Sequence, residues 1–475
     1  MRELKIQITA DRCRNSFYRF VQEFWPFPEA PVWAPHIKNI CDTLQGVGLR
    51  AIARLPFEFP YWLINVPPGT SKSTICSLMF PAWVWCVDPS IVFLTASYSA
   101  SLSGKQSRES RDIVASEKYL LHFPEVKLKG TAEQEFYTTR GGGRITTSTD
   151  GKGQGLHAHI IILDDPQTYV EAVSEKERER TNAWFDGTLP TRMKDKGNTP
   201  IIIVQQRLHP KDLTYHILSK GMKIGHICLP AELNETILPI EWSNIYTDGL
   251  LDPVRLSREV LDGMRMSMGS KAFETQIEQN PSGDENSVLK EAWLKIIALD
   301  EWRKILETHK PKVDFYLDTA YTESTKNDPT ALIAVCKVDG MMYVINCVER
   351  WLEFPDLIKE VEAWTAKNGG DHRSIIWVEP MASGKSLVQS LKRSSLNVKE
   401  YEPPKGSKLE RLISIAPKVE AGKVCVVEGS WNSPFISQVT QDYPPHDDMR
   451  DTFIMAVSHQ LIKGRTGNGP SLQFI

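Results

Sequence analysis

Short runs of apolar residues, separated by polar stretches that suit helices, constrain the fold of this chain more than any other feature. Between about Phe57 and Gln206 the runs are YWLINV, IVFLTAS, HIIILDD and PIIIVQQ. Uninterrupted apolar runs of strand length indicate strands that are buried on both faces, as in parallel sheets whose strands alternate with helices. This region therefore predicts an α/β domain with a mostly parallel sheet.

A second α/β pattern begins after Lys310. It includes VDFYLDTA, two apolar runs joined by Asp339–Gly340, and later SIIWVEP and KVCVVEG. Asp-Gly between apolar runs is a strong signal for a two-residue hairpin turn. Since 475 residues exceed the length at which a single core usually stops growing, we expect two domains.

The boundary between the two domains is expected within about residues 222–300. This segment contains proline-punctuated pieces, the helix-like SREVLDGMRMSMGSKAFETQIEQ and the turn-rich NPSGDENS. The last residues, KGRTGNGPSLQFI, have the composition of a flexible tail. The expected ranges are 1–285 for the first domain, 300–463 for the second domain and 464–475 for the tail.

Composition narrows the classes of protein and of partner. A formal net charge of −3 gives no overall attraction for a polyanion, so any nucleic acid must be held by local basic patches and metal ions. The longest apolar stretches are far shorter than a bilayer span, and the first residues lack the apolar core of a secretory signal. The eight cysteines include no CxxC pair. We therefore expect a cytoplasmic protein with reduced, mostly buried thiols and no membrane span.

The first apolar run leads into a candidate phosphate-binding loop. In such loops, backbone N–H groups at the start of a helix hold the phosphates, a lysine reaches the outer phosphates and a hydroxyl ligates Mg²⁺. Here Lys72 is the lysine, and Ser73 or Thr74 supplies the hydroxyl. The regular GxxxxGK[ST] pattern is broken, because its glycine positions hold Val66 and Ser71. The alternative is a capped helix after a proline-rich turn, with the lysine in solvent. The loop residues expected to bind the nucleotide are Pro68, Gly69, Thr70, Ser71, Lys72, Ser73 and Thr74.

Two carboxylates at the end of HIIILDDP strengthen the case for a nucleotide site. A Mg·ATP site needs one acid for the metal and one to orient the attacking water. We interpret Asp164 as the metal ligand that completes the nucleotide-binding set and Asp165 as the catalytic acid. The alternative is an ordinary turn, which the following Pro166 favours.

Polar residues elsewhere are candidates for sensing or stabilising the phosphates. Gln205, Gln206 and Arg207 follow PIIIV and could sense the γ-phosphate from an adjacent strand, although an ordinary strand end explains them equally well. Arg108 and Arg111 lie one helical turn apart and are candidates for an arginine that stabilises charge during hydrolysis. A solvated helix face is the alternative for this pair.

A separate set of acids is spread over the second α/β pattern. Asp318 ends VDFYLD, and Glu379 ends SIIWVE. Asp447 and Asp448 lie at the start of the amphipathic DDMRDTFIMAVSHQLI, which carries Asp451 one turn later. RNase H-like nucleases place one acid on the first central strand, one on a neighbouring strand and more on a late helix, so that the carboxylates converge on two divalent ions. We predict that these five acids are metal ligands, with Asp318, Glu379 and Asp448 catalytic; a surface carboxylate is the alternative for each.

Three residues near this set remain open to two interpretations. Asp328 in NDPTA is a further metal ligand or a turn residue before proline. Lys385 in MASGKS lies at a helix start and is a candidate contact to a DNA phosphate. His446 orients a carboxylate or a water, or it is a turn histidine without a catalytic role.

Taken together, these motifs resemble the large terminase subunit of tailed bacteriophages. The resemblance covers nearly all of the chain and rests on pieces that occur in the order of that family. The pieces are WAPHIKNICDTL, INVPPGTSKST, FLTASYSASLSGKQSRESRDIV, GGGRITTSTDGKGQG, IIILDDPQ, IIIVQQRLHPKDL, SKAFETQIEQNPSG, LDTAYTESTKNDPTA, VEPMASGKSLVQSL and HDDMRDTFIMA.

The resemblance implies an N-terminal P-loop ATPase domain of the ASCE type and a C-terminal RNase H-like nuclease domain. It implies that Lys72 binds Mg·ATP together with Ser73 or Thr74, that the two acids of IIILDD form the second ATPase motif, and that Gln206 lies near the coupling motif. It further implies that the acids of the second domain hold two Mg²⁺ or Mn²⁺ ions. In two places the chain departs from the family, since many relatives have glycine where this chain has Ser71, and the second ATPase acid, here Asp165, is often glutamate.

A packaging motor is the function that the resemblance implies. ATP hydrolysis would move double-stranded DNA into a procapsid, and the nuclease would cut the concatemeric genome at initiation and termination. The implied partners are double-stranded DNA, the portal protein, the small terminase subunit and further copies of the chain in a ring on the portal, with a monomer as the form in solution. The implied location is the host cytoplasm.

Two other functions are consistent with the same motifs. The first is a recombinase or transposase with an RNase H-like core and a helicase-like partner domain, which would cut DNA without moving it into a shell. The second is a scaffold for DNA or portal protein, in which the altered phosphate loop has lost its activity.

Overall fold

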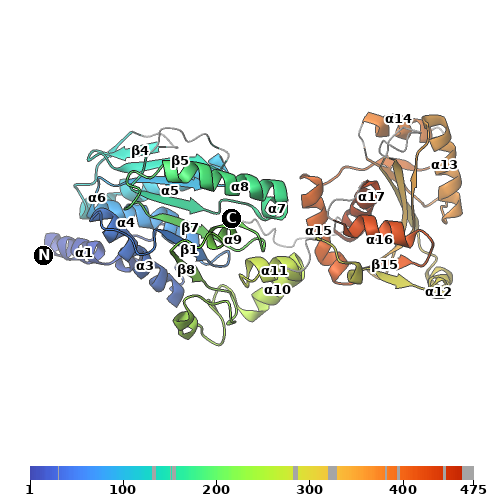
Figure 1. The fold of residues 1–475 in the computed structure, drawn as a ribbon. Helices are drawn as coiled ribbons and strands as arrows, with labels where there is room; N and C mark the ends of the chain where they lie inside the picture. The colour runs from blue at the N-terminus through green and yellow to red at the C-terminus, as the bar shows by residue number, and fades with distance from the viewer. Residues whose placement is uncertain are drawn as a thin grey trace. The chain divides into compact units, whose positions relative to one another are not determined.

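The computed structural model describes residues 1–29, 31–130, 135–149, 151, 157–281, 287–318, 329–379, 382–392, 396–441 and 446–462, with the backbone alone for 382–386. The chain divides into two compact units, Met1–Asp284 and Glu285–Ile475, called unit 1 and unit 2 below (Figure 1). The division falls inside residues 222–300. Asp328 and the tail at 464–475 lie outside the described residues.

Unit 1 is built on a mostly parallel sheet, which confirms the fold predicted for this region. Within the described residues, the sheet has eight strands in the order β3-β4-β5-β2-β6-β7-β1-β8. The strands from β5 to β8 along this order are parallel, and β3 and β4 form an antiparallel edge. The strands are β1 Tyr61–Asn65, β2 Val92–Ser97, β3 Leu128–Lys129, β4 Glu135–Thr138, β5 Gly143–Ser148, β6 Ile160–Asp164, β7 Ile201–Gln205 and β8 Ile224–Cys228.

The order of the central strands brings the predicted nucleotide residues to one edge of this sheet. β7 lies between β1, which leads into the phosphate loop, and β6, which ends at Asp164. An additional strand in this position is the ASCE arrangement. The register pairs Asn65 with Gln205 and Asp164 with Val204. Because the three strands are parallel, the residues that follow their carboxyl ends lie side by side.

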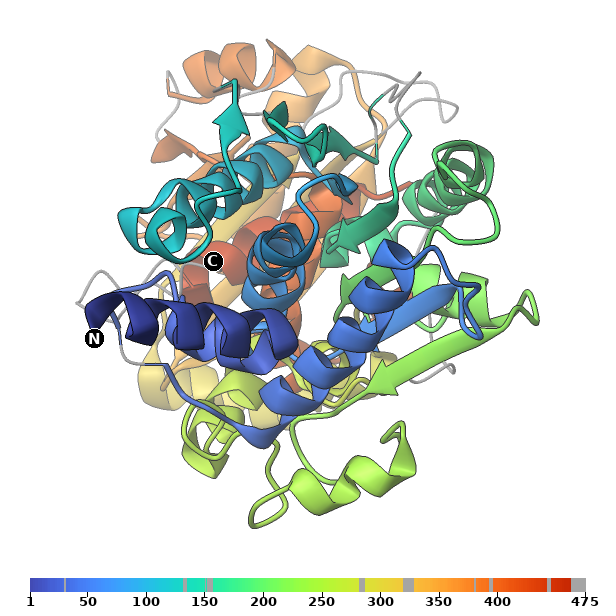
Figure 2. The same cartoon turned by 90° about the vertical axis from the view of Figure 1, so that its left-hand side faces the viewer.

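Helices cover both faces of the sheet in unit 1. Alternate strand residues point to opposite faces, so Ile64 and Ile162 pack with Trp83 of α4 on one face, while Leu63 packs with Phe185 of α8 on the other. Figure 2 views unit 1 from the side on which the dark-blue helix α1 and the N-terminus lie. The helices are α1 Arg2–Asn15, α2 Phe17–Glu23, α3 Pro35–Ile52, η1 Thr74–Met79, α4 Phe80–Val87, α5 Ala100–Ala115, α6 Glu117–His122, α7 Tyr169–Val173, α8 Glu175–Thr188, η2 Leu189–Thr191, α9 Leu213–Leu218, η3 Ile240–Ile245, α10 Arg258–Met268 and α11 Ser270–Gln276.

Single residues divide helices at two places, one of them inside the segment SREVLDGMRMSMGSKAFETQIEQ that the sequence predicts as helix-like. Ser116 has extended backbone angles, and its hydroxyl accepts a hydrogen bond from the Tyr119 N–H, so that α5 ends and α6 begins there. Gly269 has φ of +80°, and its N–H donates to the Arg265 carbonyl, so that α10 ends there and α11 follows without a side-chain cap. Both breaks depend on local capping, which the pattern of apolar residues does not record.

Unit 2 is built on a mixed sheet whose central part has the strand order of RNase H. Within the described residues, the order of its seven strands is β14-β13-β10-β11-β12-β15-β9. β10, β11 and β12 are antiparallel neighbours, and β13 and β14 run parallel to β10. The strands are β9 Lys295–Ile297, β10 Val313–Asp318, β11 Thr330–Val338, β12 Met341–Arg350, β13 Ile376–Val378, β14 Val398–Glu400 and β15 Val424–Val427.

The predicted hairpin is confirmed. Asp339 and Gly340 join β11 to β12, and Val338 pairs with Met341 across the turn. Both turn residues have positive φ, +49° and +78°, as a type I′ turn requires. The hairpin places β11 between β10 and β12 and so fixes the centre of the sheet.

Helices also cover both faces of the sheet in unit 2. Tyr316 of β10 packs with Phe453 of α17 on one face, and its neighbour Phe315 packs with Trp364 of α13 on the other. The helices are η4 Glu291–Trp293, α12 Leu299–His309, α13 Phe354–Lys367, α14 Ala382–Leu391, α15 Lys408–Glu420, α16 Asn432–Thr440, α17 Asp448–Val457 and η5 Ser458–Ile462.

Two further expectations can be compared with the structure. All eight cysteines are unpaired and buried, as predicted. In the part of the chain that the structure describes, no helix is both long enough and apolar enough to cross a membrane.

Candidate functional sites

The predicted phosphate loop connects β1 to η1 and has an unusual backbone at two positions. Gly69 has φ of +76° and Ser71 has φ of +68°. The regular motif has glycine at the position of Ser71. The left-handed backbone explains the glycine of that motif, because this conformation costs an L-residue about 1–2 kcal/mol. The loop therefore keeps a glycine-like shape without the glycine, and other contacts must offset the strain.

Residues outside the motif hold the middle of this loop. The His36 ring, from the first turn of α3, donates from Nε2 to the carbonyl of Thr70 at 3.1 Å. Burial lowers the pKa of His36 to about 4, so the ring is neutral at pH 7 and the nitrogen that faces the carbonyl carries the proton. Arg255 Nη1 donates to Ser71 Oγ at 2.6 Å. Neither His36 nor Arg255 was predicted, since neither belongs to a phosphate-loop pattern.

Lys72 is buried and bonded to two other predicted residues. Its residue exposure is 7%. The ammonium lies 3.4 Å from Asp165 Oδ2 and donates to Gln206 Oε1 at 3.2 Å. The alternative of a solvated lysine is therefore wrong, and the lysine, the acid and the glutamine form one polar cluster at the ends of β1, β6 and β7.

Asp164 is the acid in contact with the loop hydroxyl. Ser73 Oγ donates to its Oδ1 at 3.0 Å, and Gln106 Nε2 of α5 donates to its Oδ2 at 2.7 Å. Of the two loop hydroxyls predicted to ligate Mg²⁺, that of Ser73 contacts Asp164, and its role as a metal ligand stays a prediction. Burial, and then the charge of Asp165, raise the pKa of Asp164 to about 6. A carboxylate paired with a hydroxyl in this way is a suitable donor set for Mg²⁺.

Asp165 is fixed through its backbone. It has φ of +44°, its N–H donates to the Val204 carbonyl at 2.8 Å, and its own carbonyl accepts from the Tyr98 N–H at 3.0 Å. These bonds tie the end of β6 to the residues on either side. Asp165 lies at a bend before Pro166, and its carboxylate faces Lys72.

Of the three polar residues that follow PIIIV, Gln206 faces the lysine and the other two bond elsewhere. Gln205 Nε2 donates to Thr214 Oγ1 at 2.6 Å, and Arg207 Nε donates to the fully buried Asp212 at 2.9 Å. These contacts give Gln205 and Arg207 structural roles between β7 and α9.

The α5 helix reaches the site through a residue that sequence analysis missed. Gln106 contacts Asp164, whereas Arg111 Nη2 donates to the exposed Asp112 at 3.4 Å. The role of Arg111 in hydrolysis, like that of Arg108, stays a prediction. Gln106 lies within FLTASYSASLSGKQSRESRDIV, one of the pieces that carry the family resemblance, and this was the available signal.

A buried guanidinium lies beneath the same cluster. Arg144 of β5 is fully buried, and it donates to the Ser77 carbonyl at 2.6 Å and to Thr95 Oγ1 at 3.0 Å. Burial lowers the pKa of Arg144 to about 9, and the attraction of Asp164 opposes that shift. The side chain is therefore still charged at pH 7 and acts as an internal counter-ion for the buried acid.

In unit 2, the strand register places two of the predicted nuclease acids side by side. Leu317 pairs with Val378 in the parallel pair β10 and β13, so Asp318 and Glu379 are the next residues along each strand. The Glu379 N–H donates to the Leu317 carbonyl at 3.3 Å. Neighbouring strands lie about 5 Å apart, so the two acids share one edge of the sheet.

The other predicted acids belong to α17, which packs against β10 and β11. Asp448 and Asp451 are buried in its first turn, and Asp447 precedes the helix as a more exposed residue. Burial raises the pKa of Asp451, and its ion pair with Lys408 opposes this. Asp448 and Asp451 thus lie three residues apart on one face of the late helix, and Asp451 contacts α15.

Two basic side chains from α15 contact the predicted acids of unit 2. Lys408 Nζ lies 2.6 Å from Asp451 Oδ2 and 3.0 Å from Asp447 Oδ1. Arg411, one turn later, lies 3.6 Å from Glu379 Oε1. Burial disfavours the charged lysine, but the hydrogen bond and charge of Asp451 outweigh that effect and raise the pKa of Lys408.

The donor types fit divalent ions, although the acids are not yet gathered around one. Carboxylate oxygens are the ligands that Mg²⁺ and Mn²⁺ prefer. Within the described residues, however, no group of three or more His, Cys, Asp or Glu side chains is close enough to hold a metal ion. The convergence of Asp318, Glu379, Asp447, Asp448 and Asp451 on metal stays a prediction, and the contacts of Lys408 and Arg411 would have to change for it to occur.

The remaining candidates in unit 2 are only partly described. The His446 ring packs edge-on against Trp351, with centroids 6.0 Å apart. The side chain of Lys385 and all of Asp328 lie outside the described part of the chain.

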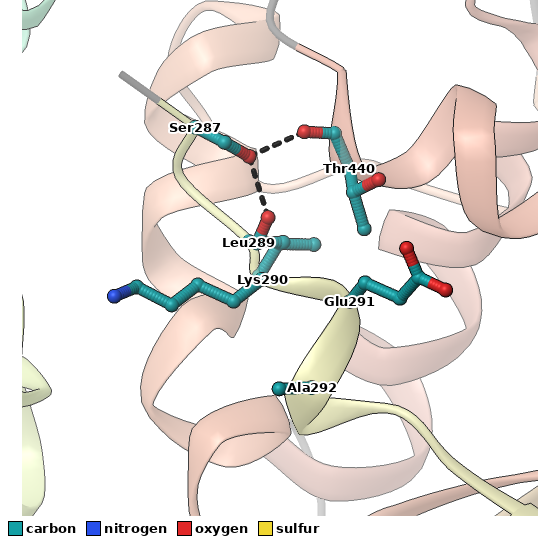
Figure 3. A pocket seen from close by; sticks show the side chains of 6 residues that line it. All are labelled: Ser287, Leu289, Lys290, Glu291, Ala292 and Thr440. Carbon is teal, nitrogen blue, oxygen red and sulfur yellow. Dashed lines mark hydrogen bonds between the residues drawn. The ribbon is translucent and has the colours of Figure 1, made fainter. Parts of the chain in front are cut away.

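A cavity of 560 Å³ in unit 2 is lined by none of these residues. The Ser287 hydroxyl donates to the carbonyls of Leu289 and Thr440 across it (Figure 3). These bonds join the start of unit 2 to the end of α16, which is a structural role.

No family model and no curated protein matches the chain. Among solved structures, a large terminase from a thermophilic bacteriophage is similar, with 10% identity over 87% of this chain and 98% of that chain and a TM-score of 0.47. The large terminase of bacteriophage HK97 is similar over 94% of this chain and 99% of that chain, with 11% identity and a TM-score of 0.38.

One more similar structure is a single domain. The large terminase nuclease from the thermophilic phage G20c, solved with bound magnesium, has 18% identity over 32% of this chain and 82% of that chain, with a TM-score of 0.25. All three come from the family that the sequence motifs resemble.

Proposed function

We propose that the chain is a large terminase subunit, in which residues 1–285 form the ATPase domain and residues 300–463 the nuclease domain. ATP hydrolysis would drive double-stranded DNA into a procapsid, and the nuclease would cut the concatemeric genome at initiation and termination. The observation that carries this proposal is the polar cluster of unit 1, where Lys72, Ser73, Asp164, Asp165 and Gln206 meet at the ends of three parallel strands.

The contacts of this cluster suggest how it handles a triphosphate. Lys72 now neutralises Asp165, and the phosphates of ATP would compete for the same ammonium. When the lysine turns to the phosphates, Asp165 is released to orient the attacking water. Gln206, which loses its own bond to the lysine, is placed to respond to the γ-phosphate. Substrate binding would thereby free the catalytic acid at the moment when it is needed.

A Mg²⁺ ion bound with ATP would be held by Ser73 and Asp164, and it would neutralise charge on the phosphates. Gln106 fixes the second oxygen of Asp164 and so leaves the first directed at the serine. We assign Arg111 as the arginine that stabilises charge during hydrolysis, acting in its own subunit or on a neighbour in the ring.

In the nuclease domain, Asp318, Glu379 and Asp448 would be the catalytic acids, and Asp447 and Asp451 would complete the ligands for two Mg²⁺ or Mn²⁺ ions. Such ions activate a water and stabilise the leaving oxygen of a phosphodiester. Asp318 and Glu379 lie at the ends of neighbouring strands, and Asp448 is buried in the first turn of α17. Lys408 and Arg411, once released from the acids, would face the negative charge of the DNA backbone.

The partners proposed for this function are double-stranded DNA, the portal protein, the small terminase subunit and other copies of the chain in a ring on the portal. A monomer in solution and a location in the host cytoplasm complete the proposal. Cutting of DNA without ATP-driven transport would instead support the recombinase or transposase alternative.

Paired substitutions test whether the two activities are separate. Lys72→Ala is expected to abolish ATP turnover and to leave Mn²⁺-dependent cleavage of a plasmid intact, whereas Asp318→Ala is expected to do the reverse. Turnover would be measured by phosphate release, and cleavage by the loss of supercoiled DNA. If the purified protein hydrolyses no ATP even with its portal present, the motor is refuted and the scaffold alternative is favoured.

A further inference from the structure

Ser71 and Arg255 form a contact that the proposed ATPase mechanism does not yet use. Ser71 lies in the phosphate loop with φ of +68°, a conformation that favours glycine. Its hydroxyl accepts a hydrogen bond from Arg255 Nη1 at 2.6 Å, although the two residues are 184 positions apart. The bond therefore joins the loop to the segment between β8 and α10.

Arg255 is itself held in place by a buried acid. Asp252 has no exposed surface, and it accepts hydrogen bonds from the Arg255 Nε, at 2.5 Å, and from the Arg255 N–H, at 3.1 Å. The carbonyl of Asp252 accepts from the Leu256 N–H at 2.8 Å, which closes a turn around the arginine. Because Nε is used by the acid and Nη1 by the serine, the guanidinium connects a fixed turn to the loop.

The third nitrogen of the Arg255 guanidinium, Nη2, differs from the other two. Arg255 Nη2 is buried, and no residue in the described part of the chain gives it a hydrogen-bond partner. A buried donor without a partner carries a free-energy cost, which is rarely tolerated away from a functional site. The unpartnered nitrogen is consistent with a side chain that is placed for its contact with the loop rather than for its own burial.

We propose that Arg255 is a positioning residue of the nucleotide site. Its bond to Ser71 Oγ holds the loop in the left-handed conformation that the regular motif obtains from glycine, so that the loop is ready for phosphates before they arrive. This inference rests on the proposed ATPase function. It also accounts for the serine, because the hydroxyl that accompanies the strained Cβ supplies the acceptor through which the strain is offset.

Two substitutions at Ser71 test the proposal without disturbing the buried pair. Ser71→Ala keeps the strained Cβ and removes the acceptor, so we expect the KM for ATP to rise about tenfold with little change in kcat. Ser71→Gly removes the acceptor and the strain together, so its KM is expected to lie about threefold or more below that of Ser71→Ala. Equal KM values for the alanine and glycine variants would overturn the proposal.

A double-mutant cycle then assigns the effect to the arginine. Lysine has a single ammonium and cannot occupy the positions of both Nε and Nη1, so Arg255→Lys is expected to raise KM several-fold. In the Ser71→Gly background the same substitution is expected to change KM less than about twofold, because the bond no longer exists. An equal rise in both backgrounds would show that Arg255 acts through overall stability or directly on the nucleotide, and would refute the positioning role.

Two controls separate this inference from the function on which it rests. The melting temperature without nucleotide, measured for every variant, shows whether unit 1 is folded. If the unsubstituted protein has no ATP turnover, or if Lys72→Ala leaves turnover unchanged, the ATPase proposal fails. If turnover is present and depends on Lys72, but Ser71→Ala matches Ser71→Gly, only the role of Arg255 fails.

Discussion

The two predicted sites differ in the origin of the basic side chain that pairs with their acids. In unit 1 the cation belongs to the site, since Lys72 is a loop residue that contacts Asp165 and Gln206. In unit 2 the cations come from α15, where Lys408 contacts acids that are predicted to bind metal. Substrate can therefore bind the lysine of the first site directly, in place of Asp165. In the second site, divalent ions would first have to displace Lys408 from the acids.

This difference suggests how one chain could carry a motor and a nuclease without destroying its own DNA. The cluster of unit 1 is already assembled, because its residues follow adjacent parallel strands. Three of the predicted acids of unit 2, Glu379, Asp447 and Asp451, are paired with Lys408 or Arg411, and an acid in an ion pair is a weaker metal ligand than a free one. On this view the resting state favours ATP turnover over cleavage.

The substitution expected to have the largest effect is Asp164→Asn in unit 1. It keeps the shape of the side chain and removes the charge that would hold Mg²⁺, so ATP turnover should fall about 10²–10³-fold. Because the buried charge is costly, which is why the pKa of Asp164 is raised, the melting temperature should not fall. Plasmid cleavage should be unaffected.

Asp262→Asn is the matched control for this substitution. Asp262 is exposed on α10, and its substitution removes the same charge from the same unit. If turnover falls equally in both variants, or if Asp164→Asn also abolishes cleavage, the two sites do not act separately.

An effect of intermediate size is expected from pH. The pKa of Asp164 is raised from the ordinary 3.8 to about 6, so its carboxylate is ionised at pH 7 and protonated as the pH falls through 6. The value of kcat/KM for ATP should therefore fall about tenfold for each unit below pH 6, where an ordinary aspartate would still be charged.

Gln106→Ala sharpens this test. The variant loses a donor that favours the ionised form, so the acid limb of the pH profile should move to higher pH. A limb that stays in place would show that another group controls it.

The smallest effect is expected in unit 2. Lys408→Ala removes the base that competes with metal for Asp451 and Asp447, so Mn²⁺ binding measured by calorimetry should become about threefold tighter. The effect is modest because the lysine side chain is 53% exposed and its charge is screened by solvent. Lys418→Ala, at the far end of the same helix, is the control, and weaker binding by Lys408→Ala would contradict the proposed competition.

Sequence analysis was most successful where burial alone decides the structure. The apolar runs predicted β1, β2, β6 and β7, since a strand that is covered on both faces must be apolar throughout. The Asp339–Gly340 turn was equally clear, because few other residues adopt its backbone angles. Both signals are local, and both were confirmed.

Contacts between distant segments were not predictable in this way. Gln106, Arg144 and Arg255 lie on α5, β5 and the segment before α10, and they contact Asp164, the Ser77 carbonyl and Ser71, respectively. Gln106 and Arg144 lie within pieces that carry the family resemblance, but those pieces do not say which residue contacts which. The choice of Gln206 over Gln205 depends on strand direction, because successive residues of a strand face opposite sides. Spacing along the chain contains no information about these partners.

The sequence by itself determined which segments become buried strands, where the loop lysine and the acids lie along the chain, and that the glycine expected at position 71 is a serine. Only the tertiary structure decided that β7 lies between β1 and β6, that Lys72 is paired with Asp165, and that Arg255 holds the strained serine. The physical reason is that apolar burial is encoded residue by residue. The pairing of polar groups, by contrast, depends on which strand ends and helices the completed fold brings within hydrogen-bond distance.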